Sequence, residues 1–291
     1  MTRTSEIADS FAAVVRDRGD APLLLAPSEH RVCSARHLDA TAHALARAFQ
    51  ALGLADGHLI IASTGNVAAL PALMLAALRC GLPVMPVDRS TPTAELLTLA
   101  RRWDAAALIV GDQVQVAEPS DAGTLRRAAL PEGLAAWVRT PRPEPGRHGD
   151  AVVLKLTSGS TGAPRATHTE ERHLVADVRH IVQAMEIGRD DRQLGMIPLS
   201  HSYGFSNLLL PLLWRDGRGV PPRDRPQGAV VLRLERDRWH LLRRGPRAGL
   251  AGAGRPAHGR HAGDADRGRG GARRLWARAG ARAERHRPVC D

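Results

Sequence analysis

One stretch decides the fold and the chemistry of this chain: Thr157-Ser158-Gly159-Ser160-Thr161-Gly162-Ala163-Pro164-Arg165. It follows directly on residues 151–156, an apolar run of strand length, and a helical pattern near residues 169–184 comes after it. A strand that ends in Gly, Ser and Thr exposes successive backbone N–H groups, and glycines let that backbone close around phosphate oxygens. The hydroxyls and the Arg165 guanidinium add donors and a fixed positive charge. The stretch therefore predicts a loop that suits the β- and γ-phosphates of ATP.

Two neighbouring motifs do not fit this stretch. The nucleotide P-loop needs a lysine after its last glycine, whereas Ala163 follows Gly162. The esterase elbow needs a glycine two residues before its serine, and Ser158 stands two before Ser160. A flexible Ser/Gly turn stays open as an alternative for the run taken alone. The strand before it and the Pro-Arg pair after it favour the phosphate loop.

The pattern around the loop predicts an α/β fold. Strand-like runs at residues 58–62, 83–88 and 106–110 alternate with helical patterns at 67–79 and 95–102. Such alternation predicts βαβ units, with right-handed crossovers that place helices on the faces of parallel-type sheets. The remaining expectations are helices at 5–18, 34–52 and 208–213, a strand at 193–197, a linker or surface loop at 141–149, and helix N-caps at Ser34 and Asn66.

Several segments of the sequence resemble those of a known enzyme family. Residues 156–165 resemble the signature loop of adenylate-forming enzymes, which include acyl-CoA synthetases, aryl-CoA ligases and luciferases. That loop ordinarily ends in lysine, and Arg165 keeps the charge but not the shape. Residues 34–54, 78–88 and 198–205 resemble three further segments of that family, in the same order. The resemblance spans roughly residues 5–215 and implies the N-terminal part of an adenylate-forming domain, so we expect a partial AMP-binding domain at 1–215.

The resemblance also implies roles for individual residues. Arg165 and the loop would hold the ATP phosphates and the leaving pyrophosphate, and Thr157 would lie near Mg²⁺. His201 would sit between the acyl carboxylate and the α-phosphate, so His201 and Arg165 are the expected catalytic residues. Tyr203 and Gly204 would help to form the wall of the acyl pocket. The phosphate-binding set is Thr157, Ser158, Gly159, Ser160, Thr161, Gly162 and Arg165.

Each histidine has a structural and a functional explanation, and its surroundings decide between them. Without the resemblance, His201 is better explained as a satisfied core histidine; with it, the site is favoured. His168 and His173 lack the HExxH pattern of a metal helix and are assigned to a solvated face.

The family reaction has two halves. A carboxylate and ATP give an acyl-adenylate and pyrophosphate, and a thiol of CoA or of a carrier protein then displaces AMP. Both halves develop charge at phosphorus or carbonyl, which donor loops and cations stabilise. The implied cofactors are ATP and Mg²⁺, with CoA as co-substrate. Amino-acid-activating relatives typically carry a Phe-Asp pair where this chain has Ser200-His201, which favours a fatty, aryl or other simple carboxylic acid.

The excess of basic over acidic residues is confined to the end of the chain. The net charge is +11, and residues 218–291 hold 19 Arg against 7 acidic residues. Residues 216–291 are therefore expected to be a low-complexity basic tail, either disordered or frame-shifted. Arg267-Gly268-Arg269 resembles an RNA-binding segment, but aromatic stacking partners are nearly lacking, so nucleic acid is an unlikely partner.

Other features point to a cytoplasmic protein without a membrane span. The three cysteines form no CxxC pair, and the N-terminus lacks a signal-peptide pattern. The most apolar stretch, residues 67–87, contains an arginine, a glycine and three prolines. A buried helix followed by a buried strand explains it better than a bilayer span.

Several family segments do not occur in this sequence. These are the Tyr-Gly-x-Thr-Glu segment, the Thr-Gly-Asp segment and the lid lysine; the chain's only lysine is Lys155. We therefore expect a truncated chain that is inactive alone, cut by a reading-frame shift soon after Trp214. Translating the other two frames tests this, and finding no such segment there would defeat it. A noncatalytic fragment and a basic-tail nucleic-acid-binding protein remain the alternatives.

Overall fold

The computed structural model describes residues 4–116, 124–157, 164–188, 191–214 and 231–234. All of them belong to the compact unit formed by residues 1–240, and the second unit, 241–291, lies outside the described residues. The helical elements are α1 (Glu6–Arg18), η1 (Pro27–Glu29), α2 (Ala35–Ala51), α3 (Ala69–Cys80), α4 (Thr93–Arg102), α5 (Glu171–Ala184), α6 (Ser202–Gly204), η2 (Phe205–Leu209) and α7 (Leu210–Leu213). The strands are β1 (Pro22–Ala26), β2 (Arg31–Ser34), β3 (Ile60–Ser63), β4 (Val84–Pro86), β5 (Ala107–Gly111), β6 (Thr124–Leu130), β7 (Leu134–Thr140), β8 (Ala151–Thr157), β9 (Arg165–Glu170), β10 (Arg192–Gly195) and β11 (Val231–Leu234).

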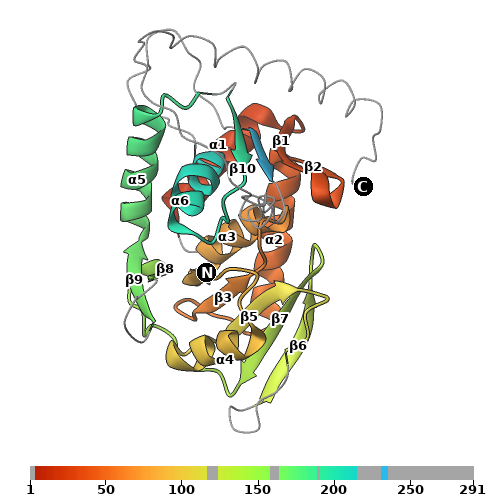
Figure 1. Ribbon diagram of the computed structural model, residues 1–291, viewed down its shortest axis with the longest axis vertical. Coiled ribbons are helices and arrows are strands. Elements are labelled where there is room, and N and C mark those ends of the chain that lie inside the picture. Colours follow the sequence, from red (N-terminus) through yellow and green to blue (C-terminus); the bar gives the residue numbers. More distant parts are fainter. Residues whose placement is uncertain (1–3, 117–123, 158–163, 189–190, 215–230, 235–291) are drawn as a thin grey trace, which may run out of the picture. The chain divides into compact units, whose positions relative to one another are not determined.

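The larger sheet has seven strands in the order β6-β7-β5-β3-β4-β8-β9 (Figure 1). Its central strands β5, β3, β4 and β8 are parallel, as the βαβ pattern predicts. Its two edges are antiparallel: β7 and β6 extend one side, and β9 pairs with β8 on the other. The α/β prediction is confirmed, with a mixed rather than purely parallel sheet.

The antiparallel edge at β9 corrects one predicted boundary. The helix expected from residue 169 begins only at Glu171, because residues 165–170 pair with β8. Glu170 and His173 then form a reciprocal cap, in which each side chain accepts a backbone N–H of the other residue.

A smaller sheet has the order β10-β11-β1-β2. Strand β11 is parallel to both β10 and β1, and β2 is antiparallel to β1. The basic tail expected from the sequence includes residues 231–234, so strand β11 was not predicted. The other residues of the expected tail, 216–230 and 235–291, lie outside the described part of the chain.

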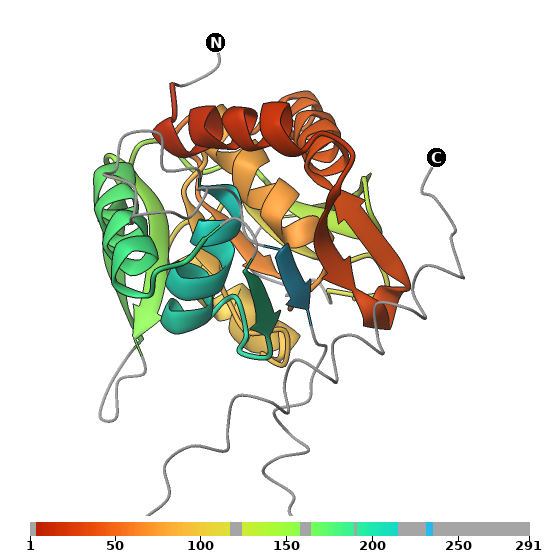
Figure 2. The same cartoon turned by 90° about the horizontal axis from the view of Figure 1, so that it is seen from above.

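Two apolar cores cover the two faces of the larger sheet. On β3, Ile60 and Ala62 join the core that contains α1, α2 and α3, whereas Ile61 joins the core under α4. This alternation is the period-two pattern of a strand buried on both faces. Figure 2 shows α1 alongside α2 and α3.

The apolar stretch at residues 67–87 forms α3 and then β4, as expected. Ten of the twelve α3 residues are buried, which explains why the helix is apolar on all sides. In the described part of the chain, no helix is both long and apolar enough to cross a membrane.

Candidate functional site

The predicted phosphate loop joins the paired strands β8 and β9. Thr157 and Arg165 are direct partners in the antiparallel register, and the Thr157 hydroxyl donates to the Arg165 carbonyl at 3.3 Å. Both residues are exposed. The loop residues Ser158, Gly159, Ser160, Thr161 and Gly162 lie outside the described residues. The structure thus fixes the two ends of the loop opposite each other, at the carboxyl end of a parallel strand of the sheet.

The second predicted segment forms a tight turn that leads into α6. His201 stands at the helix N-cap: its Nδ1 accepts the Tyr203 amide at 3.3 Å, and its carbonyl accepts the Phe205 amide at 2.8 Å. His201 and Tyr203 are exposed, and Tyr203 retains 48% of its surface. An exposed ring is incompatible with a core histidine, so that alternative is excluded. Nδ1 acts as the acceptor here, which leaves Nε2 available for another partner.

Gly204, expected in the acyl-pocket wall, is buried and has a local steric reason to be glycine. A Cβ atom there would lie 2.3 Å from the Pro198 carbonyl oxygen and 3.1 Å from Leu199 Cα. The missing side chain lets α6 pack directly on the turn that precedes it. This close approach places His201 at the start of the helix.

Asn66 ties this segment to the carboxyl end of β3. Its Nδ2 donates to the carbonyls of Gly195 and Ile197, at 3.1 and 3.0 Å, and its Oδ1 accepts the Leu199 amide at 2.8 Å. The prediction that Asn66 caps the next helix is therefore wrong. Helix α3 begins after Ala68, whose amide donates to the Glu29 carboxylate, and the Asn66 amide is used up by residues more than 120 positions away.

Lys155 ties the same segment to β8. Its Nζ donates to Ser206 Oγ at 3.1 Å and lies 5.2 Å from the centroid of the Phe205 ring. Burial lowers the pKa of Lys155, and the negative charge of Asp177 partly opposes this effect. The strand that carries Thr157 therefore also contacts the helix that follows His201. No hydrogen bond or ion pair joins His201 to Arg165 in the described residues; the structure relates them through this strand-to-helix contact and through α5, which packs on both β9 and η2.

The loop at residues 141–149 is held against the fold by two histidines. His58 accepts the Ala55 amide at Nδ1 and lies 3.1 Å from the Pro143 carbonyl through Nε2. His148 lies 2.9 Å from the Trp103 carbonyl. Burial lowers the pKa of both imidazoles, despite the opposing effect of these carbonyl contacts. His168 and His173 are exposed, as predicted.

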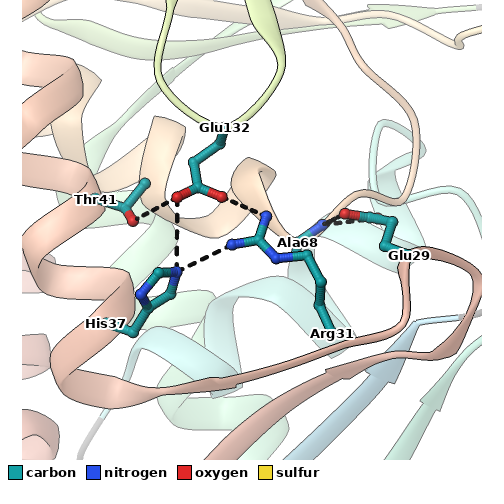
Figure 3. Close-up of polar contacts among 6 residues, drawn as sticks. All are labelled: Glu29, Arg31, His37, Thr41, Ala68 and Glu132. Atoms are coloured by element: carbon teal, nitrogen blue, oxygen red, sulfur yellow. Dashed lines mark hydrogen bonds and ion pairs between the residues drawn. The ribbon is translucent and has the colours of Figure 1, made fainter. Parts of the chain in front are cut away.

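A separate cavity of about 190 Å³, lined by both polar and apolar residues, lies at the carboxyl ends of β3 and β5. Its lining includes Glu29 and Glu132, and Figure 3 shows what holds these carboxylates. Glu132, at the tip of the β6–β7 hairpin, pairs with Arg31 and accepts the Thr41 hydroxyl at 3.3 Å. His37 lies 3.6 Å from the same carboxylate. These contacts connect the hairpin to β2 and α2, which gives the cluster a structural role.

The described residues suit Mg²⁺ only to a limited extent. Thr157 offers a hydroxyl oxygen, the hard ligand type that Mg²⁺ accepts. The other ligands of the Mg²⁺ ion would come from phosphates and water. Within the described ranges, no group of three or more His, Cys, Asp or Glu side chains could hold a metal. A Mg²⁺ ion at this site would therefore bind together with the nucleotide, whose phosphates would supply further ligands.

Comparison with known proteins shows the family to which the chain belongs. The AMP-binding enzyme family matches residues 11–238, and the chain therefore belongs to this family of adenylate-forming enzymes. The match continues beyond Trp214. The chain is 26% identical over 239 residues to the sulfoacetate–CoA ligase of Cupriavidus necator, covering 75% of this chain and 46% of that protein. It is 29% identical over 199 residues to the 2-succinylbenzoate–CoA ligase of Salmonella typhimurium, covering 68% and 40%.

Solved structures show the same fold. The crystal structure of CmiS6 superposes with a TM-score of 0.63 at 26% identity, covering 82% of this chain and 54% of that chain. The N-terminal domain of FACL13 from Mycobacterium tuberculosis gives a TM-score of 0.60 at 15% identity, covering 80% and 57%. The chain thus spans about half the length of these four proteins.

Proposed function

We propose that this chain binds the polyphosphate of ATP at the loop between β8 and β9, as part of a site that adenylates a carboxylic acid. The observation that supports this most directly is the pairing of Thr157 with Arg165 across the hairpin. That pairing puts a hydroxyl and a guanidinium at the two ends of a loop rich in glycine and hydroxyl groups. Such a set of donors and a cation suits phosphate oxygens.

Each residue then has a role in the first half-reaction. Arg165 donates to the phosphate oxygens and stabilises the charge that grows on pyrophosphate as it leaves. Thr157 would help to hold Mg²⁺, which when bound would neutralise part of the same charge. His201 donates from Nε2 at the point where the acid's carboxylate attacks the α-phosphate, and Tyr203 and Gly204 form one wall of the acyl pocket. The second half-reaction passes the acyl group to a thiol of CoA or of a carrier protein.

The substrate is a fatty, aryl or other simple carboxylic acid, and the reaction is cytoplasmic. This class agrees with the relatives, which are named as CoA ligases of organic acids. We further propose that residues 1–291 do not complete the reaction alone, because the segments expected to hold ribose and to supply the lid lysine do not occur in the sequence.

Equilibrium binding of Mg·ATP to the chain tests the proposal. We expect Arg165→Gln to weaken binding about tenfold to a hundredfold, the effect of one charged hydrogen-bonding group. Arg172→Gln is the matched control, because Arg172 is exposed on α5 and already pairs with Glu170. Equal affinity of the Arg165 variant and the unaltered chain would refute the phosphate role.

ATP–pyrophosphate exchange with a panel of fatty and aryl acids tests completeness separately. We expect little or no exchange from the chain alone. Robust exchange would show that this chain is sufficient for adenylation and would contradict the proposal that it is incomplete.

A further inference from the structure

Lys155, the only lysine of the sequence, places its ammonium group beside the candidate acyl segment. The side chain is half-buried on β8. Its neighbours are buried as well: Ser206 retains 7% of its surface and Phe205 retains 1%. The ammonium has therefore exchanged part of its water for one hydroxyl and the face of one ring.

This cation has hydrogen-bonding capacity that its described neighbours do not use. An ammonium group carries three N–H donors, and Ser206 accepts from one of them. Among the described residues, no carboxylate lies within ion-pair distance of Nζ, and Asp177 acts on it only through longer-range attraction. A half-buried charge without a counter-ion is costly, so an anion that reaches this point gains a favourable interaction.

The position of Ser206 relates this cation to the proposed substrate. Ser206 and Phe205 belong to the π-helical turn η2, which continues directly from α6. The Lys155 ammonium thus contacts the helical segment immediately after Tyr203, the expected wall of the acyl pocket.

We propose that Lys155 determines substrate specificity by binding a second acidic group, so that the preferred acid is a doubly anionic one. A short dicarboxylate or sulfocarboxylate would place its carboxylate near His201 and its second anion at Nζ. A monocarboxylic chain would instead place methyl and methylene groups against a charged group that has lost water. This inference rests on the proposed function, because it assumes that His201 and Tyr203 face the acid.

The single lysine gives a direct probe. Chain produced with ¹³Cε-labelled lysine has one labelled side-chain signal, and Lys155→Met removes it, which verifies the assignment. The signal is followed at fixed pH while succinate or butyrate is added; these acids share a four-carbon chain and differ in one carboxylate. We expect succinate to shift the signal saturably, with half-saturation at a concentration about tenfold or more below that of butyrate. Ser206→Ala, which keeps the ammonium, should retain the preference.

The decisive comparison uses the affinity for the same two acids in Lys155→Met and Lys155→Arg, measured by calorimetry. The methionine variant should bind both acids equally, and the arginine variant should keep the preference for succinate. Three results would overturn the inference: no shift with either acid, equal responses to both, or the same shift with inorganic sulfate, which indicates a general anion contact.

Mg·ATP binding is measured on the same samples, so that failure of the Lys155 inference can be distinguished from failure of the proposed function. ATP binding that depends on Arg165, without any succinate preference, defeats the Lys155 inference alone. A succinate preference that depends on Lys155, without ATP binding, defeats the proposed function alone.

Discussion

Replacing Asn66 with alanine tests how the candidate acyl segment is held. The side-chain amide makes three hydrogen bonds to the backbone of residues 195–199, and the variant loses all of them. A typical hydrogen bond contributes about 0.5–1.5 kcal/mol net, and a buried donor left without a partner costs about 1–3 kcal/mol. Leu199, whose amide loses its acceptor, is fully buried. We therefore expect the free energy of unfolding to fall by about 2–4 kcal/mol.

Urea unfolding followed by circular dichroism measures this change. Asn207→Ala is the matched control, because its amide makes a single exposed hydrogen bond to the Tyr203 carbonyl; it should cost less than about 1 kcal/mol. Asn66→Asp keeps the acceptor for Leu199 but turns an oxygen toward the two carbonyls, so it should be at least as destabilising as alanine near neutral pH. If Asn66→Ala costs no more than the Asn207 control, the tethering argument is wrong.

Three further predictions follow from single contacts. His58 has a lowered folded pKa, so the unfolded chain takes up its proton first; stability is highest above the ordinary value of 6.5 and falls as pH drops below it. His58→Gln should flatten that decline in pH-dependent urea melts. Gly204→Ala forces a Cβ to 2.3 Å from a carbonyl oxygen and should cost about 1–3 kcal/mol; an unchanged melt would contradict the close packing. Glu132→Gln breaks the ion pair with Arg31, whose two side chains are only 17% and 20% exposed, and should cost about 1–3 kcal/mol of stability in the same assay. Asp20→Asn is the control and should cost less than about 0.5 kcal/mol, because its partner Arg36 is 67% exposed.

The sequence predicted the parallel centre of the larger sheet because its strands are buried on both faces. Continuous apolar runs of strand length, such as residues 106–110, leave few alternatives when helical patterns alternate with them. The edge strands β6 and β9 were missed because they are half-exposed and rich in arginine and threonine. Their pairing depends on the neighbouring strand rather than on a pattern of their own.

The candidate site was predictable in part, from the motif residues. Thr157 follows a strand signal, but the pairing that puts Arg165 opposite it depends on β9, which the sequence did not indicate. Asn66 and Lys155 could not be assigned in this way, because each acts on residues far along the chain. Asn66 shows the difficulty well: a residue with good N-cap chemistry forms long-range hydrogen bonds instead, and Glu29 takes over the helix amide.

Hydrogen exchange with and without Mg·ATP tests the central claim most directly. If the polyphosphate binds between the ends of β8 and β9, the nucleotide should slow exchange of the backbone amides in peptides that cover residues 157–165. The same peptides in Arg165→Gln should show much weaker protection at equal ATP concentration. Protection confined to other segments, or equal protection in the variant, would contradict the account.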